Sequence, residues 1–197
     1  VIFSRVKRDF EEGIKNLEAN IKKNKKLPEY LVKNVKAWAA LFRIQLREGF
    51  PNPVDSDDTA IKKYVDKELK IRLWDDMVDA SNPRLVKNLT VSGILYEYLN
   101  THPKTKIKPD ILNWLAILDR ELQDTLFYSL SDLYLKQCMS EFTSHPTAKK
   151  CFDEYKKNAV LSYSGSSGTH LPADVKAELK DWSLKVYGTD KSNVETK

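Results

Sequence analysis

A length of 197 residues, with 41% hydrophobic and 31% charged side chains, is typical of a globular chain with one sizeable core and excludes a disordered protein. The net charge is +5, but the first 50 residues hold 12 Lys or Arg against 6 Asp or Glu, so the positive excess is local. Only six glycines occur, too few for the frequent tight turns of a β-sandwich or barrel. We therefore expect an all-α chain.

Apolar residues at helical spacing predict two helices in the N-terminal region. The stripe of the first helix consists of Val6, Phe10, Ile14, Leu17 and Ile21. Lysines follow at its end, where positive charge complements the helix dipole. The second helix is predicted to open at Pro28 and to end at Gly49. Its apolar face consists of Leu31, Val35, Trp38, Phe42 and Leu46.

A third helix is predicted after a loop rich in Pro, Asn and Asp at residues 50–57. Ser56 or Asp57 can cap its N-terminus, because both side chains accept hydrogen bonds from free backbone N–H groups. The helix is expected to run to about Ala80, either as one helix or as two joined near Leu69.

Prolines mark the starts of four more helices, since proline is tolerated in the first helical turn. These starts lie near Pro83, Pro109, Pro146 and Pro172. A further helix is predicted from about Asp124 to Phe142 by its leucines. The elements together predict a single all-α domain of about eight helices, either an antiparallel helical bundle or an irregular α-solenoid.

The expected organisation is a helical core domain over residues 1–160 and a C-terminal helix over 171–188 that packs on it. Residues 161–170 are expected to form a flexible Ser/Gly loop, in which the run at 164–168 is either native or a linker. Residues 189–197 are predicted to be a disordered tail. Because the chain begins with Val rather than Met, we expect an excised domain or a chain whose start was removed.

The cysteines and histidines predict no catalytic or metal site. Cys138 and Cys151 lack the CxxC spacing, so we expect two packed apolar residues in a reducing compartment and an intracellular protein, cytoplasmic or nuclear. His102, His145 and His170 lie in turns without a third ligand nearby. No run reaches the roughly 18 apolar residues of a membrane span, so no membrane partner is expected.

Residues 75–79, Asp-Asp-Met-Val-Asp, have the DDxxD spacing that places carboxylates along one helical face, where they could hold Mg²⁺ bound to a diphosphate. The segment resembles the aspartate-rich motif of all-α prenyl-diphosphate synthases, and Arg84 matches the first of that family's two arginines. Leu85 replaces the second arginine, and no second aspartate-rich motif follows. The resemblance implies a Mg²⁺-dependent diphosphate-handling enzyme as a distant alternative; a solvated acidic face explains the same residues.

A basic cluster lies where the first two predicted helices meet. It consists of Lys22, Lys23, Lys25, Lys26, Lys33 and Lys36. Such a cluster could contact phosphates, which makes binding of RNA or another nucleic acid the main alternative function. Lysines at a helix end are also ordinary dipole partners.

The favoured function is a non-enzymatic helical module for protein–protein interaction, an adaptor or scaffold subunit without cofactor or catalytic residues. Four tryptophans fall on apolar faces, where core packing is their usual role, and any exposed one would anchor a partner protein. They are Trp38, Trp74, Trp114 and Trp182. The stripe of the first helix could also pair with a second copy of the chain.

Overall fold

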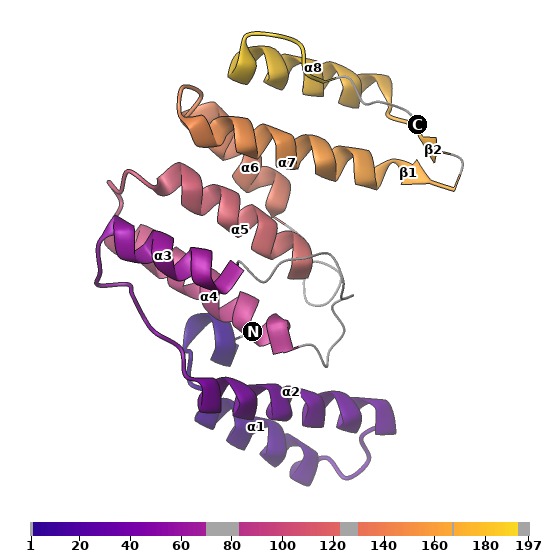
Figure 1. The fold of residues 1–197 in the computed structure, drawn as a ribbon. Coiled ribbons are helices and arrows are strands. Elements are labelled where there is room, and N and C mark those ends of the chain that lie inside the picture. The colour runs from indigo at the N-terminus through magenta and orange to yellow at the C-terminus, as the bar shows by residue number, and fades with distance from the viewer. Residues whose placement is uncertain (1, 70–82, 123–129, 167, 193–197) are drawn as a thin grey trace. The chain divides into compact units, whose positions relative to one another are not determined.

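The computed structural model describes residues 2–69, 83–122, 130–166 and 168–192. These residues form eight α-helices, one π-helical turn and one two-stranded hairpin (Figure 1). The predicted all-α class is confirmed, and a single all-α domain fits the chain. Within it the residues group into two compact units. Unit 1 comprises Val1–Thr105 and Glu121–Tyr128, and unit 2 comprises Lys106–Arg120 and Ser129–Lys197.

Unit 1 contains the elements of the N-terminal half. They are η1 (Ile2–Val6), α1 (Phe10–Lys23), α2 (Glu29–Glu48), α3 (Asp58–Leu69) and α4 (Pro83–Thr101). Helices α1 and α2 pack along each other as a hairpin, and α2 and η1 both contact α4. The buried residues of one core cluster are Phe10, Leu41, Phe42 and Val86. Phe42 meets the rings of Phe10 and Trp38 edge to face, with centroids 5.5 and 5.9 Å apart.

Helix α1 begins later than the apolar stripe predicted. Asp9 caps it by accepting a hydrogen bond of 2.8 Å from the backbone N–H of Glu12, and Arg8 before it adopts a left-handed φ of 53°. Val6, predicted on the stripe, therefore lies in the separate η1 turn and is 67% exposed. Its spacing fits a helix, but the capping side chain three residues on decides where the helix starts.

Glycines permit two close approaches in unit 1. A Cβ at Gly13 would lie 2.6 Å from the ring of Phe42, so glycine lets α1 pack tightly on α2. A Cβ at Gly93 would lie 1.9 Å from the carbonyl oxygen of Arg5, so η1 crosses α4 directly over that residue.

Unit 2 contains the remaining elements. They are α5 (Lys108–Leu122, within this unit to Arg120), α6 (Ser131–Glu141), α7 (Pro146–Ser162), β1 (Ser164–Gly165), β2 (Gly168–Thr169) and α8 (Ala173–Tyr187). Four helices contribute to its core. The buried residues are Leu112, Ala116, Leu135, Cys138, Met139, Ala148, Cys151, Phe152, Tyr155, Leu179 and Val186. The predicted proline starts are confirmed here, with Pro146 opening α7 and Pro172 directly before α8.

Two segments of unit 2 differ from the prediction. Helix α6 is described from Ser131, and Leu130 before it is not helical, with its backbone N–H donating to the carboxylate of Asp119; the predicted part at residues 124–129 lies outside the described residues. Within the predicted flexible loop, β1 and β2 form a short antiparallel pair, in which Ser164 lies opposite Thr169.

Cys138 and Cys151 are joined in a disulfide, so the prediction of two packed thiols was wrong. Their burial was predicted, since both side chains are fully buried in the core of unit 2. The pairing could not be predicted from the sequence, because 13 residues separate the two cysteines and they form no recognised motif. The short connection between α6 and α7 brings the Cα atoms of the two cysteines to 6.4 Å, within disulfide range.

Of the described helices, none is both long and apolar enough to cross a membrane.

Candidate functional site

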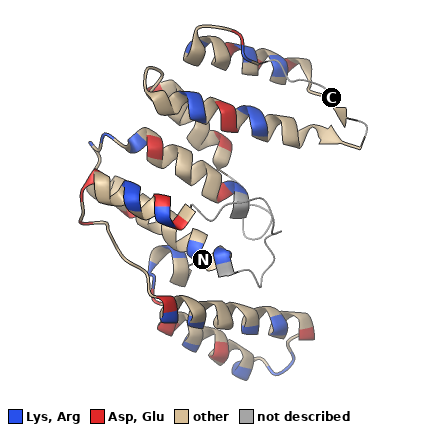
Figure 2. Cartoon of the chain, in the orientation of Figure 1, with Lys and Arg blue, Asp and Glu red and all other residues tan. Residues whose placement is uncertain are grey.

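The six lysines of the basic cluster gather around the end of the α1–α2 hairpin at which the two helices are connected. Lys22 and Lys23 end α1, Lys25 and Lys26 lie in the turn, and Lys33 and Lys36 follow on α2. All six side chains are exposed, and the turn itself is drawn in blue in Figure 2. Over residues 10–48 the hairpin holds 9 Lys or Arg and 5 Asp or Glu, which makes this surface attractive to anions.

Most of this positive charge is unneutralised. Lys33 pairs with Glu29 at 3.4 Å, one turn earlier on α2, where both side chains are largely exposed and the pair contributes little. The other five lysines make no ion pair or hydrogen bond within the described part of the chain. The N-terminus of α2 adds a positive dipole end at the same place, because Pro28 supplies no side-chain cap.

A pocket of about 240 Å³ lies along the seam of the hairpin. Its apolar part is formed by Ile21 of α1 and by Val35 and Ala39 of α2. Lys22 and Lys36 stand beside these residues. The remaining lining residues, Glu18 and Arg43, form an ion pair between the two helices. The pocket thus joins an apolar surface to two lysine ammonium groups with no acidic partner among the described residues.

Sequence reasoning missed the apolar half of this site and one aromatic residue beside it. Tyr30, in the first turn of α2, is 63% exposed between lysines that precede and follow it along the chain. Its position next to Leu31 places it off the apolar stripe of α2, and that offset is a signal the sequence carries. The pocket has no such signal, because it requires the register of one helix against another.

The tryptophans predicted as partner anchors are not exposed where the structure describes them. Trp38 packs against the core cluster of unit 1, and Trp182 packs against the core of unit 2, with its indole N–H 3.4 Å from a carboxylate oxygen of Glu178. Trp114 on α5 is half-buried. Trp74 lies outside the described residues. The geometry therefore favours the packing role for Trp38 and Trp182.

The stripe of the first helix, considered above as a self-association surface, is largely used inside unit 1. Phe10 is buried in the core cluster, and Ile14 and Leu17 pack against it. Because these side chains already face α2 and its neighbours, pairing α1 with a second copy would require the hairpin to open.

At the other predicted sites the structure describes no arrangement of side chains that supports chemistry or metal binding. The DDxxD segment at residues 75–79 lies outside the described part of the chain. Among the residues that are described, no three His, Cys, Asp or Glu side chains group so as to hold a metal ion. His145 caps α7 by accepting a hydrogen bond of 3.2 Å from the N–H of Thr147, and His102 stacks on the ring of Tyr98 with centroids 4.3 Å apart.

Tyr98 is a buried side chain of unit 1 whose hydroxyl could in principle act as an acid or base. Its hydroxyl donates a hydrogen bond of 2.7 Å to Asp58, which also accepts one of 2.5 Å from the hydroxyl of Thr105. Burial and the bond to Asp58 raise the pKa of Tyr98 to about 12. At neutral pH the phenol stays protonated, so the arrangement ties the start of α3 to α4 rather than supplying an acid or base.

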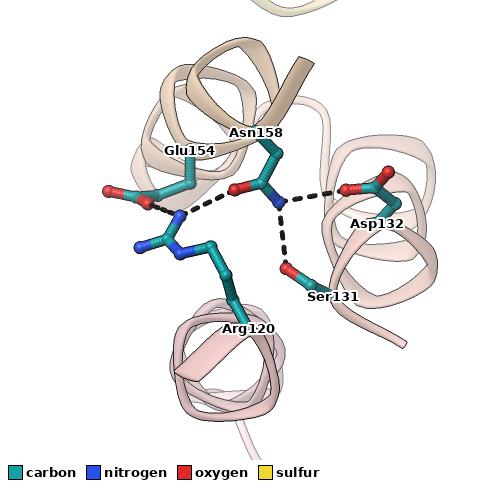
Figure 3. A network of polar contacts seen from close by, with 5 residues as sticks. All are labelled: Arg120, Ser131, Asp132, Glu154 and Asn158. Atoms are coloured by element: carbon teal, nitrogen blue, oxygen red, sulfur yellow. Dashed lines mark hydrogen bonds and ion pairs between the residues drawn. The ribbon is translucent and has the colours of Figure 1, made fainter. Parts of the chain in front are cut away.

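A polar network joins three helices of unit 2, as Figure 3 shows. The guanidinium of Arg120 on α5 donates hydrogen bonds of 2.6 Å to Glu154 and 2.8 Å to Asn158, both on α7. The amide of Asn158 donates in turn to Ser131 and Asp132 at the start of α6, at 3.1 and 3.0 Å. Because each of these groups has a partner, we assign the network to holding α5, α6 and α7 together.

Comparison of the chain with family models, with curated proteins and with solved structures finds no match.

Proposed function

We propose that the chain is a helical protein-interaction module that binds an acidic segment of a partner protein on its α1–α2 hairpin, without chemistry. The pocket between the two helices carries the proposal, because it combines apolar residues with lysines that lack acidic partners in the described chain. A segment with one large apolar side chain flanked by Asp or Glu would satisfy both features at once.

The apolar half of the pocket favours a protein over a nucleic acid. Phosphate groups would be attracted to the same lysines, but a nucleic acid backbone offers only sugar carbons bonded next to oxygens, and no aliphatic side chain, to place against Ile21 and Val35. Bases bind proteins by stacking on aromatic side chains, and among the described residues of the hairpin turn and its flanks Tyr30 alone could serve for that. RNA binding is therefore the competing outcome of the test.

The two halves of the site are expected to act differently. Burying an aliphatic side chain in the pocket removes apolar surface from water, at about 25 cal/mol per Å². The exposed lysines contribute little to affinity in physiological salt, but they speed the encounter with an acidic partner and select against basic ones. Binding should therefore weaken with salt through its on-rate and persist through the apolar contact.

The test measures binding of a fluorescent peptide with a central leucine flanked by Asp and Glu, followed by anisotropy. Replacing Lys22 and Lys36 with Glu should weaken binding at least tenfold, because each substitution places a carboxylate in the pocket lining, where it repels the acidic peptide. The matched control replaces Lys63 and Lys150, two exposed lysines on α3 and α7, with Glu and should leave the affinity for the peptide unchanged. Exchanging the central leucine of the peptide for asparagine should also weaken binding.

Two outcomes would contradict the proposal. One is equal binding by the Lys22/Lys36 variant and its control. The other is preferential binding of single-stranded RNA that is lost on changing Tyr30 to Ala and falls steeply with salt, which would establish the alternative function.

A further inference from the structure

From the position of the disulfide between α6 and α7 we infer that the chain matures in an oxidising compartment, where bond formation stabilises unit 2. Cys138 and Cys151 are the only cysteines of the chain, and both lie in this unit. In forming the bond, the two thiols lose two protons and two electrons to the disulfide of a thiol–disulfide oxidoreductase, which becomes a dithiol. Cellular compartments that keep thiols reduced rarely contain such bonds.

Burial makes this bond a permanent element of the fold. Both cysteines are 0% exposed, and Leu135, Met139 and Phe152 belong to the same core cluster. Thiol–disulfide exchange requires an attacking thiolate to reach one of the two sulfurs. No thiol can do so in folded unit 2, so the bond should react only when the unit opens.

The bond also connects the parts of unit 2 that hold its core together. Cys138 lies in the second half of α6 and Cys151 in the first half of α7, so the bond closes the short connection between the two helices. Residues of α5 and α8 complete the same core. Because cross-linking restricts the unfolded chain, closing a loop of about 15 residues favours folding by about a hundredfold in the equilibrium constant.

The inference also limits the class of partner that the α1–α2 hairpin can meet, and this step rests on the proposed function. A protein matured in an oxidising compartment meets partners that are secreted or that reside in that compartment. An acidic protein segment fits that setting better than an intracellular RNA does. The disulfide itself stands on the geometry of unit 2 and does not depend on what the hairpin binds.

The first experiment examines the full chain taken from the cells or medium that produce it, acid-quenched and alkylated in denaturant. We expect no alkyl group on either cysteine and an intact mass two hydrogens below that of the dithiol. Two alkylated cysteines would overturn the inference.

The second experiment measures the protection of α6 and α7 by hydrogen exchange, with and without prior reduction in denaturant and refolding. Reduction should raise the opening equilibrium of these helices about a hundredfold and leave α1 and α2 unchanged. The Cys138→Ala/Cys151→Ala variant serves as a second form without the bond, in which the bond cannot form again. Equal protection of oxidised and reduced chains would contradict the stabilising role. Peptide binding by the hairpin is scored separately, so its failure would leave this result standing.

Discussion

The two units reach stability by different means. Unit 1 is held by a cluster of aromatic rings around Phe42, and the surface of its α1–α2 hairpin carries lysines without acidic partners in the described chain. Unit 2 has an apolar core from four helices, and a buried disulfide and the polar network of Arg120 add to it. Because the residues of the aromatic cluster are not those that line the pocket, the pocket residues can serve binding. In unit 2 the polar side chains between the helices are already used for structure.

Removing the central ring of unit 1 should give the largest effect. Phe42→Ala deletes a buried ring with two edge-to-face partners, and such deletions cost about 3–5 kcal/mol in unfolding free energy. Hydrogen exchange should show lost protection in α1 and α2 and retained protection in α6 and α7. The mirror variant is Phe152→Ala, which removes a fully buried ring from unit 2. Loss of protection in both units from either variant would contradict the assignment of separate stabilising contacts to the two units.

The polar network of unit 2 should give an intermediate effect. Arg120→Met keeps the aliphatic stem but leaves Glu154 and the amide oxygen of Asn158 without their donor, at a cost of about 1–3 kcal/mol. The matched control in unit 1 is Arg43→Met, which removes an ion pair with Glu18 whose side chains are about half exposed. That loss should cost less than about 1 kcal/mol. Equal losses in chemical denaturation would show that the network is no stronger than a surface pair.

The helices of both units could be predicted because their signals are local. His145 and Pro146 mark the start of α7 through capping and a fixed φ, and Gly49 marks the end of α2 through its left-handed φ of 70°. Each acts within one turn of the chain. The basic cluster could also be predicted, because consecutive lysines at a helix end remain close whatever the fold.

The pocket and the disulfide could not be predicted, because both depend on contacts between helices. Ile21 and Val35 line one pocket only because α1 packs on α2 at a register that Gly13 permits. Cys138 and Cys151 meet only because α6 and α7 lie side by side. Periodicity shows that such residues face inward or outward, but it does not show which residue on the neighbouring helix they meet.

The smallest expected effect concerns the ion pair between Lys108 and Glu141, which joins the start of α5 to the end of α6 at 2.8 Å. Hydrogen bonds from Lys108 and then from Gln137 hold the pKa of Glu141 below its ordinary value of 4.5. Because the folded pKa is lowered, the stabilisation is fully present above pH 4.5 and is lost as pH falls through the folded value. Because both side chains are partly exposed, the ion pair stabilises the fold by only about 0.3 kcal/mol.

Glu141→Gln tests this contribution, measured by chemical denaturation at pH 7 and at acidic pH. The variant should be slightly less stable than the parent chain at pH 7, and the difference should vanish once the carboxylate of the parent is protonated. In a Lys108→Met background the same substitution should show a smaller difference at pH 7, since the main donor is gone. A difference that grows on acidification would mean that Glu141 destabilises unit 2 when ionised, and would reverse the sign assigned to this pair.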